Sequence, residues 1–214
     1  IWGADHHGYI DRLKTGLKAL GIDPKRLKII ITQLVRLVEN GREMKMSKRA
    51  GEFVTLDDLI KEVGKDATRF FFLMHSPDSH MDFDLALAKE KSLKNPVYYV
   101  QYAYVRCSSI IKKAGKNPNV KKMGDLDSEA GLNLGRELIK WPDILKQVAK
   151  DFEVSRISRY ALEISRALHN FYEKERVMEN GGKPNEARLA LVGAARSVLG
   201  KIFDTLGISK PEKM

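Results

Sequence analysis

Residues 155–178 have the sequence SRISRYALEISRALHNFYEKERVM, in which apolar side chains recur at intervals of three and four positions. These intervals place the side chains on one face of an amphipathic helix, because an α-helix completes a turn in about 3.6 residues. A face of this kind is stable in water only when other elements cover it, so the segment predicts a long helix inside a helical bundle. The apolar face consists of Ile157, Tyr160, Ala161, Ile164, Leu168 and Phe171.

The whole second half of the chain has the same helical character. Helices are expected over residues 96–113 and 142–152, each with a proline in its first turn, where proline is tolerated. Another helix is expected over residues 186–206 and ends at Gly207. We therefore expect an all-α bundle over residues 85–214. The apolar side of its last helix consists of Leu189, Val192, Ala195, Leu199, Ile202 and Phe203.

The first part of the chain mixes strand and helix signals. Residues 27–38 are rich in β-branched side chains and are followed by Asn40-Gly41, a strong turn signal, so we expect a strand there. A helix over residues 9–20 precedes this strand, and Thr55 is a predicted helix N-cap. Turn, helix and strand in this order are typical of an α/β sheet, so we assign residues 1–84 to an α/β part.

Composition favours a polyanionic partner. The 214 residues carry 38 Lys and Arg against 28 Asp and Glu, a formal net charge of +10, and nucleic acid is the commonest partner for such a charge. One cysteine, Cys107, excludes a disulfide or a multi-cysteine zinc site within these residues, and we expect it to be buried or half-buried. No apolar run is long enough to span a bilayer. We expect a cytoplasmic protein that is a monomer.

A short basic segment, Lys45-Met46-Ser47-Lys48-Arg49, follows the predicted strand. A loop with two lysines and an arginine can fold over a triphosphate and neutralise the charge that develops on a pyrophosphate leaving group. Lysine suits this role because its ammonium is a point charge on a flexible stem. Basic clusters are common, however, so composition alone leaves a solvated loop as the alternative.

Two other groups of residues allow both a functional and a structural interpretation. Tyr99, Tyr102 and Arg106 share one face of a predicted helix, where they could stack on unpaired bases and bind phosphate. The alternative is a pair of half-buried aromatic rings with an arginine that reaches solvent. Asp82 and Asp84 resemble a catalytic acid and base, but we expect them to fill turn or cap positions before a helix.

The order of the motifs narrows the family. Residues 45–49 resemble the KMSKS signature of class I aminoacyl-tRNA synthetases, with Arg49 in place of the last serine. Residues 2–9, WGADHHGY, resemble a block of bacterial arginyl-tRNA synthetases; because position 9 is Tyr, the His-x-Gly-His signature of class I enzymes is absent. The chain is similar to the same family in further blocks, which are residues 51–60, 66–73, 81–85, 95–103 and 169–177.

The resemblance implies that the α/β part is the second portion of a Rossmann-like catalytic domain that binds ATP with Mg²⁺. Lys45 and Lys48 would be the catalytic residues that stabilise the triphosphate. Neither a metal ligand nor a tightly bound cofactor is expected in this chain. Gly3 and Asp5 would hold the adenosine, with His6 and His7 as weaker candidates. The residues expected to bind the nucleotide are Gly3, Asp5, His6, His7, Met46 and Ser47.

The resemblance also implies that residues 85–214 form a DALR anticodon-binding domain, whose partner is the arginine tRNA. It favours the functional interpretation of the face that contains Tyr102. Tyr172 would face the anticodon loop, whereas Phe171 would lie in the core. The residues expected to bind RNA are Tyr99, Tyr102, Arg106, Tyr172, Arg176 and Met214.

The extent of the chain shapes the expected activity. It opens at Ile1 without an initiator Met, whereas residues 210–214 resemble the usual C-terminus of the family, so we expect a C-terminal portion. The parent would attach arginine to its tRNA with ATP, and the portion alone would be inactive and marginally stable or self-associating over residues 1–84. A stand-alone RNA-binding module is the alternative. A cysteinyl-tRNA synthetase would need zinc-binding cysteines that this chain lacks.

Overall fold

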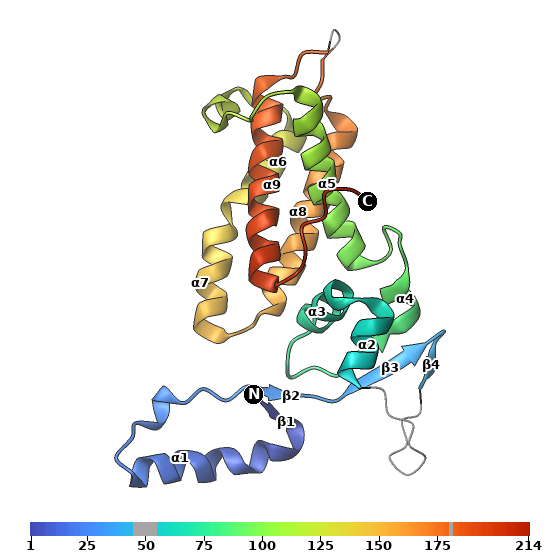
Figure 1. Ribbon diagram of the computed structural model, residues 1–214. Coiled ribbons are helices and arrows are strands. Elements are labelled where there is room, and N and C mark those ends of the chain that lie inside the picture. Colours follow the sequence, from blue (N-terminus) through green and yellow to red (C-terminus); the bar gives the residue numbers. More distant parts are fainter. Residues whose placement is uncertain (45–54, 180–181) are drawn as a thin grey trace. The chain divides into compact units, whose positions relative to one another are not determined.

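The computed structural model describes residues 1–44, 55–179 and 182–214 (Figure 1). The chain forms two compact units, and each unit is made of two separate stretches of sequence. The first unit contains Ile1–Phe53 and His75–Leu85, and the second contains Val54–Met74 and Ala86–Met214. Helices dominate the described residues, as expected for the second half of the chain.

The first unit begins with two short parallel strands, β1 (Trp2–Gly3) and β2 (Ile31–Thr32). The connection between them contains the 3-10 helices η1 (Ala4–Tyr9) and η2 (Pro24–Arg26) and the helix α1 (Ile10–Ala19). None of the ten residues of α1 is buried. This helix therefore contributes little to a hydrophobic core.

A second sheet of the first unit has the strand order β4–β3–β5. It consists of β3 (Val35–Glu39), β4 (Arg42–Glu43) and β5 (Met81–Asp84). Strands β3 and β4 form an antiparallel hairpin around Asn40-Gly41, whose φ angles of 51° and 75° suit a type I′ turn. The turn predicted at this dipeptide is therefore confirmed. Strand β5 runs parallel to β3.

The prediction of a single strand over residues 27–38 is wrong. Residues 31–32 pair with β1, whereas residues 35–38 pair with β5, so the chain changes its pairing partner between them. At this change the Gln33 N–H donates to the Pro77 carbonyl at 2.8 Å, and Leu34 is 79% exposed. A β-branched composition marks segments that suit a sheet, but it does not specify which strand each segment joins.

The turn or cap role expected for Asp82 is also wrong, because this residue lies inside β5. Met81 and Phe83 are buried and Asp82 between them is exposed, as the two-residue period of a strand requires. Arg36 on β3 donates to Asp82 from Nε to Oδ1 at 2.7 Å and from Nη2 to Oδ2 at 3.0 Å. Asp84 is the last residue of β5 and directly precedes a helix.

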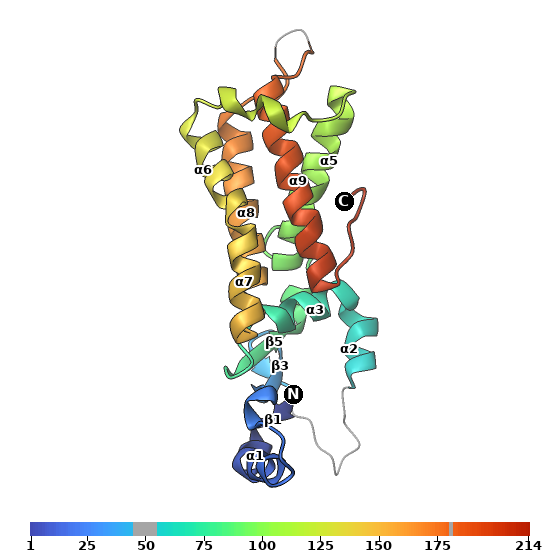
Figure 2. The same ribbon diagram turned by 90° about the vertical axis from the view of Figure 1, so that its left-hand side faces the viewer.

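The remaining helices belong almost entirely to the second unit. Figures 1 and 2 show three long helices, α5, α8 and α9, side by side, with α6 and α7 following one another along α8. The helices are α2 (Leu56–Val63), α3 (Lys65–Met74), α4 (Leu85–Lys89), α5 (Pro96–Ala114), η3 (Val120–Asp125), α6 (Glu129–Ile139), α7 (Trp141–Asp151), α8 (Ser155–Lys174) and α9 (Glu186–Leu206).

The core of the second unit lies where the apolar faces of α8 and α9 meet their neighbours. All six predicted apolar residues of α8 and all six of α9 are at most 2% exposed, which confirms both faces. Tyr160 stacks on Trp141 with ring centroids 6.0 Å apart and donates its hydroxyl proton to the Glu137 carbonyl at 2.6 Å. Burial of each large apolar side chain stabilises the fold by about 1.5–3 kcal/mol, which makes this core the main source of stability.

The helix ends follow local chemistry more closely than apolar periodicity. Thr55 and Asp58 form a reciprocal capping box at the start of α2, which confirms Thr55 as an N-cap. Helix α8 ends at Lys174 rather than at Met178, because Glu175 is extended and Met178 forms a β-bridge with Pro184. The apolar stripe ends at Phe171, and the three helical residues after it, Tyr172, Glu173 and Lys174, are exposed, so apolar burial does not favour a longer helix.

Helix α3 is fixed to the long helices of the second unit. Ser158 on α8 donates its hydroxyl proton to the Leu73 carbonyl at 3.0 Å, and the Ser209 N–H donates to Asp66 at 3.0 Å. Residues 54–74 therefore belong to the same compact unit as α5, α8 and α9. The compact units thus divide the chain differently from the domain boundary expected between residues 84 and 85, which stays a prediction about the parent protein.

Candidate nucleic-acid interface

Helices α5 and α8 bring four of the predicted RNA-binding residues together with a histidine. The residues lie on one face of α5 and near the end of α8, and we call them the aromatic–arginine cluster. The start of α5 is fixed by Asn95, whose side chain accepts from the Val97 N–H, and by Pro96 in the first turn. The cluster consists of Tyr99, Tyr102, Arg106, His169 and Tyr172.

Arg106 is the centre of the cluster. Its guanidinium carbon lies 4.8 Å from the ring centroid of Tyr102 on the same helix and 4.4 Å from that of Tyr172 on α8. The Nη2 group also donates to the Tyr102 hydroxyl at 2.7 Å. Within residues 55–179 and 182–214, the groups that contact this guanidinium are aromatic rings and a hydroxyl. No carboxylate of these residues forms an ion pair with it. Its positive charge is therefore not neutralised by an ion pair there.

His169 lies among the other side chains of the cluster. Its ring centroid is 4.8 Å from that of Tyr99 and 5.8 Å from that of Tyr102, and Arg106 Nη1 is 3.5 Å from its Nδ1 atom. Burial lowers the pKa of His169, and the Arg106 charge lowers it further, while Glu173 opposes the shift. The imidazole is therefore neutral at physiological pH.

The cluster is only partly covered by protein. Tyr172 is 41% exposed, whereas Tyr99 and Tyr102 are half-buried. Burial raises the pKa of the Tyr99 hydroxyl, so this ring is neutral at physiological pH. Ring faces beside an unpaired guanidinium are suited to stacking on unpaired bases and to binding a phosphate.

The other two predicted RNA-binding residues lie elsewhere. Arg176 follows the end of α8 and is exposed, and its backbone carbonyl accepts from Arg188 Nη1 at 2.9 Å. Met214 is 46% exposed at the end of the C-terminal tail. The tail residues before it line a pocket with Tyr104, which is two positions and so roughly 200° around α5 from Tyr102. Among the residues that the structure describes, neither Arg176 nor Met214 forms a hydrogen bond, ion pair or ring contact with the cluster.

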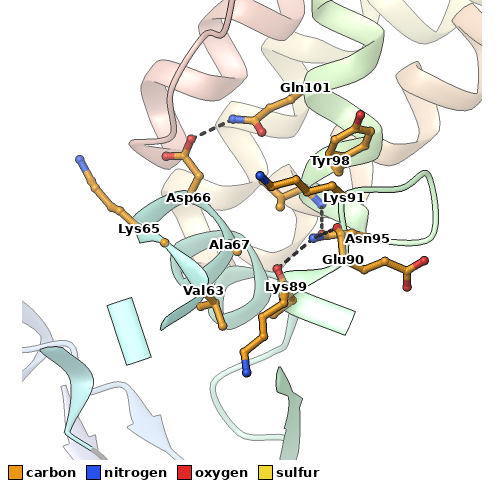
Figure 3. A pocket seen from close by; sticks show the side chains of 13 residues that line it. Val63, Lys65, Asp66, Ala67, Lys89, Glu90, Lys91, Asn95, Tyr98 and Gln101 are labelled. Carbon is orange, nitrogen blue, oxygen red and sulfur yellow. Dashed lines mark hydrogen bonds between the residues drawn. The ribbon is translucent and has the colours of Figure 1, made fainter. Parts of the chain in front are cut away.

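A second polar pocket lies between the α2–α3 turn, the end of α4 and the start of α5 (Figure 3). Asn95 donates from Nδ2 to the carbonyls of Ala88 and Glu90 at 3.1 and 2.9 Å. Gln101 donates from Nε2 to Asp66 at 2.9 Å. Both buried amides therefore have acceptors, and their hydrogen bonds stabilise the junction of α3, α4 and α5.

The predicted nucleotide-binding residues of the first unit lie in the turn that follows β1. Gly3 ends the strand, and a Cβ atom added there would meet the Asp5 carboxylate at 2.7 Å. His6 Nε2 lies 3.6 Å from Asp5 Oδ2, and its ring is 6.2 Å from that of Trp2. A turn at the carboxyl end of a parallel strand is where open α/β sheets bind nucleotides. Lys45, Met46, Ser47 and Lys48 lie outside the described residues.

Comparison with known proteins identifies the family of the chain. Residues 100–214 match the family model of the DALR anticodon binding domain, which is more than half of the chain. The chain belongs to this family. Four members of the cluster, Tyr102, Arg106, His169 and Tyr172, lie inside the matched DALR domain, and Tyr99 directly precedes it.

Full-length relatives extend the match beyond the DALR domain. The chain is 48% identical to an arginine–tRNA ligase of Carboxydothermus hydrogenoformans and 46% identical to that of Desulforudis audaxviator, over the entire chain in both cases. It spans only 40% and 39% of the lengths of these relatives. The resemblance to arginyl-tRNA synthetases that the sequence motifs indicate is therefore confirmed.

Solved structures have the same fold as the chain. A Campylobacter jejuni protein assigned as an arginyl-tRNA synthetase superposes on the whole chain with a TM-score of 0.88 at 32% identity, and the chain covers 47% of it. The arginyl-tRNA synthetase of Thermus thermophilus has the same fold, with a TM-score of 0.74 at 21% identity over the whole chain and 40% of its own length. In the part of our chain that is described, no helix is long and apolar enough to cross a membrane.

Sequence reasoning did not assign a role to His169. The residue directly follows Leu168 of the apolar stripe, and it lies three positions before Tyr172, so both share one side of α8. That spacing is the sequence signal that could have placed His169 beside Tyr172. The contact with Tyr99 and Arg106 depends on how α5 packs against α8, which one sequence does not specify.

Proposed function

We propose that the DALR domain of this chain binds the anticodon loop of an arginine tRNA, and that the aromatic–arginine cluster stacks on its unpaired bases. The observation that carries this proposal is the position of Arg106 between two aromatic rings, at 4.8 and 4.4 Å, on a partly exposed surface. Such a guanidinium offers a stacking plane and a positive charge in the same place. The formal net charge of +10 adds long-range attraction for RNA.

The exposure of the cluster favours binding over a purely structural role. A ring that serves only the core is buried on both faces, as Phe171 is at 0% exposure, but the adjacent Tyr172 is 41% exposed. A base that stacks on such a ring contributes about 1–3 kcal/mol to binding. We propose Arg176 as a phosphate contact and Met214 as a neighbour of the loop, both on the strength of the family relationship.

In the whole protein we propose ATP-dependent attachment of arginine to its tRNA. The first unit would supply the second portion of a Rossmann-like sheet, with Lys45 and Lys48 at the triphosphate and Mg²⁺ accompanying ATP. The turn after β1 supports a nucleotide role for Gly3 and Asp5, because it follows a parallel strand. His6, His7, Met46 and Ser47 complete the proposed nucleotide site.

The test of the proposed RNA role measures binding of the 214-residue chain to two RNAs across a salt series. One RNA is an arginine tRNA transcript, and the other carries altered anticodon-loop bases. We expect tighter binding to the unaltered loop at every salt concentration, because contacts with base edges distinguish the two loops and depend less on salt than phosphate contacts do. Equal affinity for the two RNAs would contradict the proposal.

A matched pair of variants assigns the effect to the cluster. Arg106→Gln removes the central guanidinium, and Arg136→Gln removes an exposed arginine of the same charge on α6. We expect Arg106→Gln to abolish discrimination between the RNAs and Arg136→Gln to preserve it. Equal effects of the two variants would show that only overall charge matters.

The catalytic proposal has a separate test. Catalysis by positioning needs all the reacting groups in one site. Incubation of the chain with ATP, arginine and tRNA should therefore give no charged tRNA, whereas the longer parent protein should give it. Arginine- and tRNA-dependent aminoacylation by the 214-residue chain would contradict the expectation that the portion is inactive alone.

A further inference from the structure

One buried polar atom in the aromatic–arginine cluster has no partner. Nε2 of His169 is enclosed and forms no hydrogen bond with any described residue. Within the described chain it is the sole buried side-chain nitrogen or oxygen in this situation. A buried donor or acceptor without a partner costs about 1–3 kcal/mol, so a ligand that supplies the missing partner would gain binding free energy here.

The neighbouring contact identifies which form of the imidazole is present. Arg106 Nη1 lies 3.5 Å from Nδ1 of His169, and a guanidinium can only donate hydrogen bonds. Nδ1 must therefore present its lone pair toward Arg106. Because the ring is neutral, the proton resides on the other nitrogen, so the unpartnered group is an Nε2–H donor.

We propose that His169 is a specificity-determining residue whose Nε2–H donates to an acceptor on the edge of an unpaired RNA base. The acceptor would be a carbonyl oxygen or an unprotonated ring nitrogen, because Nε2–H can only donate. This inference rests on the proposed function, since it supposes that bases enter the cluster. It adds hydrogen-bond selection to the stacking that Tyr102 and Arg106 provide.

Access to the donor requires a side chain to move. Nε2 is enclosed in the free chain, and the Tyr99 ring packs 4.8 Å from the imidazole at an interplanar angle of 55°. The inference therefore requires that the Tyr99 ring rotates about χ1 and that a base takes its place beside the imidazole. Tyr99 is at the start of α5, outside the tight contact between Arg106 and Tyr172. The base would thus replace one aromatic neighbour and gain a hydrogen bond that Tyr99 does not make.

The test uses three variants of the 214-residue chain and transcripts in which each anticodon-loop base is replaced in turn. His169→Phe keeps an aromatic ring without a donor. His169→Gln places an amide donor near the position of Nε2, whereas His169→Asn places its donor near Nδ1. We expect His169→Phe and His169→Asn to lose about 5- to 150-fold in discrimination at one base position, and His169→Gln to retain most of it. Undiminished discrimination by His169→Phe at every position would overturn the inference.

Nuclear magnetic resonance of the ¹⁵N-labelled chain gives a second readout that does not depend on the variants folding. The free chain should show His169 with a proton on Nε2 and none on Nδ1. Addition of the arginine tRNA transcript should shift the Nε2–H resonance, and a transcript with the critical base replaced should not. An unchanged Nε2–H resonance in the complex, or a proton on Nδ1 in the free chain, would overturn the inference.

The outcomes also separate this inference from the proposed function. If Arg106→Gln abolishes discrimination but His169→Phe does not, the cluster binds bases without using His169, and only the inference fails. If the unsubstituted 214-residue chain does not discriminate between transcripts at all, the proposed function and the inference both fail.

Discussion

Arg69 on α3 donates a hydrogen bond of 2.8 Å from Nε to the backbone carbonyl of Leu206, the last residue of α9. The two residues are 137 positions apart in sequence. A helix leaves its last carbonyls without partners, and a guanidinium satisfies one of them and complements the negative end of the helix. The contact therefore joins the start of the helical unit to its end.

Arg69 is exposed, so we expect Arg69→Met to lower the free energy of unfolding by about 0.5–1.5 kcal/mol, because it removes the hydrogen bond to the helix end and keeps the packing of the side-chain stem. Urea denaturation followed by circular dichroism measures the change. The control is Arg136→Met on α6, an exposed residue that should change stability by less than about 0.5 kcal/mol. Equal effects of the two variants would mean that the Arg69 contact is not stabilising.

Gly207 should not tolerate a side chain. Its φ is 68°, and an added Cβ atom would lie 3.0 Å from Nε of Arg69. Gly207→Ala should therefore destabilise the chain by about 1 kcal/mol or more. Gly135→Ala, in α6 with nothing within 4 Å of the added atom, should stabilise it by about 0.5–1 kcal/mol. Opposite signs in thermal denaturation are the expected result, and a stabilising Gly207→Ala would contradict this account.

His169 should make stability depend on pH. Its pKa is lowered in the folded chain, mainly by burial and further by the Arg106 charge. The unfolded chain therefore binds this proton at higher pH than the folded chain does. The free energy of unfolding should thus fall as pH drops from about 6.5 toward the lower folded pKa, and it should be unaffected well above about 6.5. The difference between the unsubstituted 214-residue chain and its His169→Gln variant isolates this contribution, because the other four histidines are common to both. Parallel pH curves would contradict the prediction.

Cys107 should be inert while the chain is folded. It is 0% exposed on α5, as its residue type predicts, and burial raises its pKa to about 12. The thiolate is the reactive form, so a disulfide reagent at pH 8 should modify the folded chain no faster than it unfolds. The denatured chain should react at once with one equivalent. Rapid modification of the folded chain would show that α5 opens locally.

Helix α1 should exchange its amide hydrogens much faster than α8 and α9. None of its residues is buried, whereas the apolar faces of α8 and α9 are almost completely buried. Few buried contacts mean a low free energy for local opening. Hydrogen exchange followed by mass spectrometry should show early exchange over residues 10–19 and late exchange over residues 186–206. This result would also support the marginal stability predicted for residues 1–84, whereas equal protection would contradict it.

Periodicity predicted the helical core because that core is built on single helix faces. The stripe from Ile157 to Phe171 and the apolar side of the last helix can be identified from spacing alone, and burial confirms both. Helix α6 was not predicted separately. The strand over residues 27–38 failed because the pairing partner changes after Thr32, and strand pairing depends on segments distant in sequence.

The candidate site was predictable to a similar degree. Spacing placed Tyr99, Tyr102 and Arg106 on one helix face, and the family resemblance added Tyr172 from another helix. The structure brings these four together. His169 required knowledge of the packing between α5 and α8, and its orphan nitrogen can be recognised only once every neighbour is in place.

The interleaved order of the two compact units limits how this protein can be dissected. The chain passes from one unit to the other three times, after Phe53, Met74 and Leu85. No single cleavage can therefore release either unit intact, and an expression fragment that starts at residue 85 would lack α2 and α3. Such a fragment would lose Phe70 and Phe71, which are at most 5% exposed in the whole chain, and would leave the surfaces of α5, α8 and α9 that contact α3 open to water. A soluble RNA-binding fragment should instead start before Thr55.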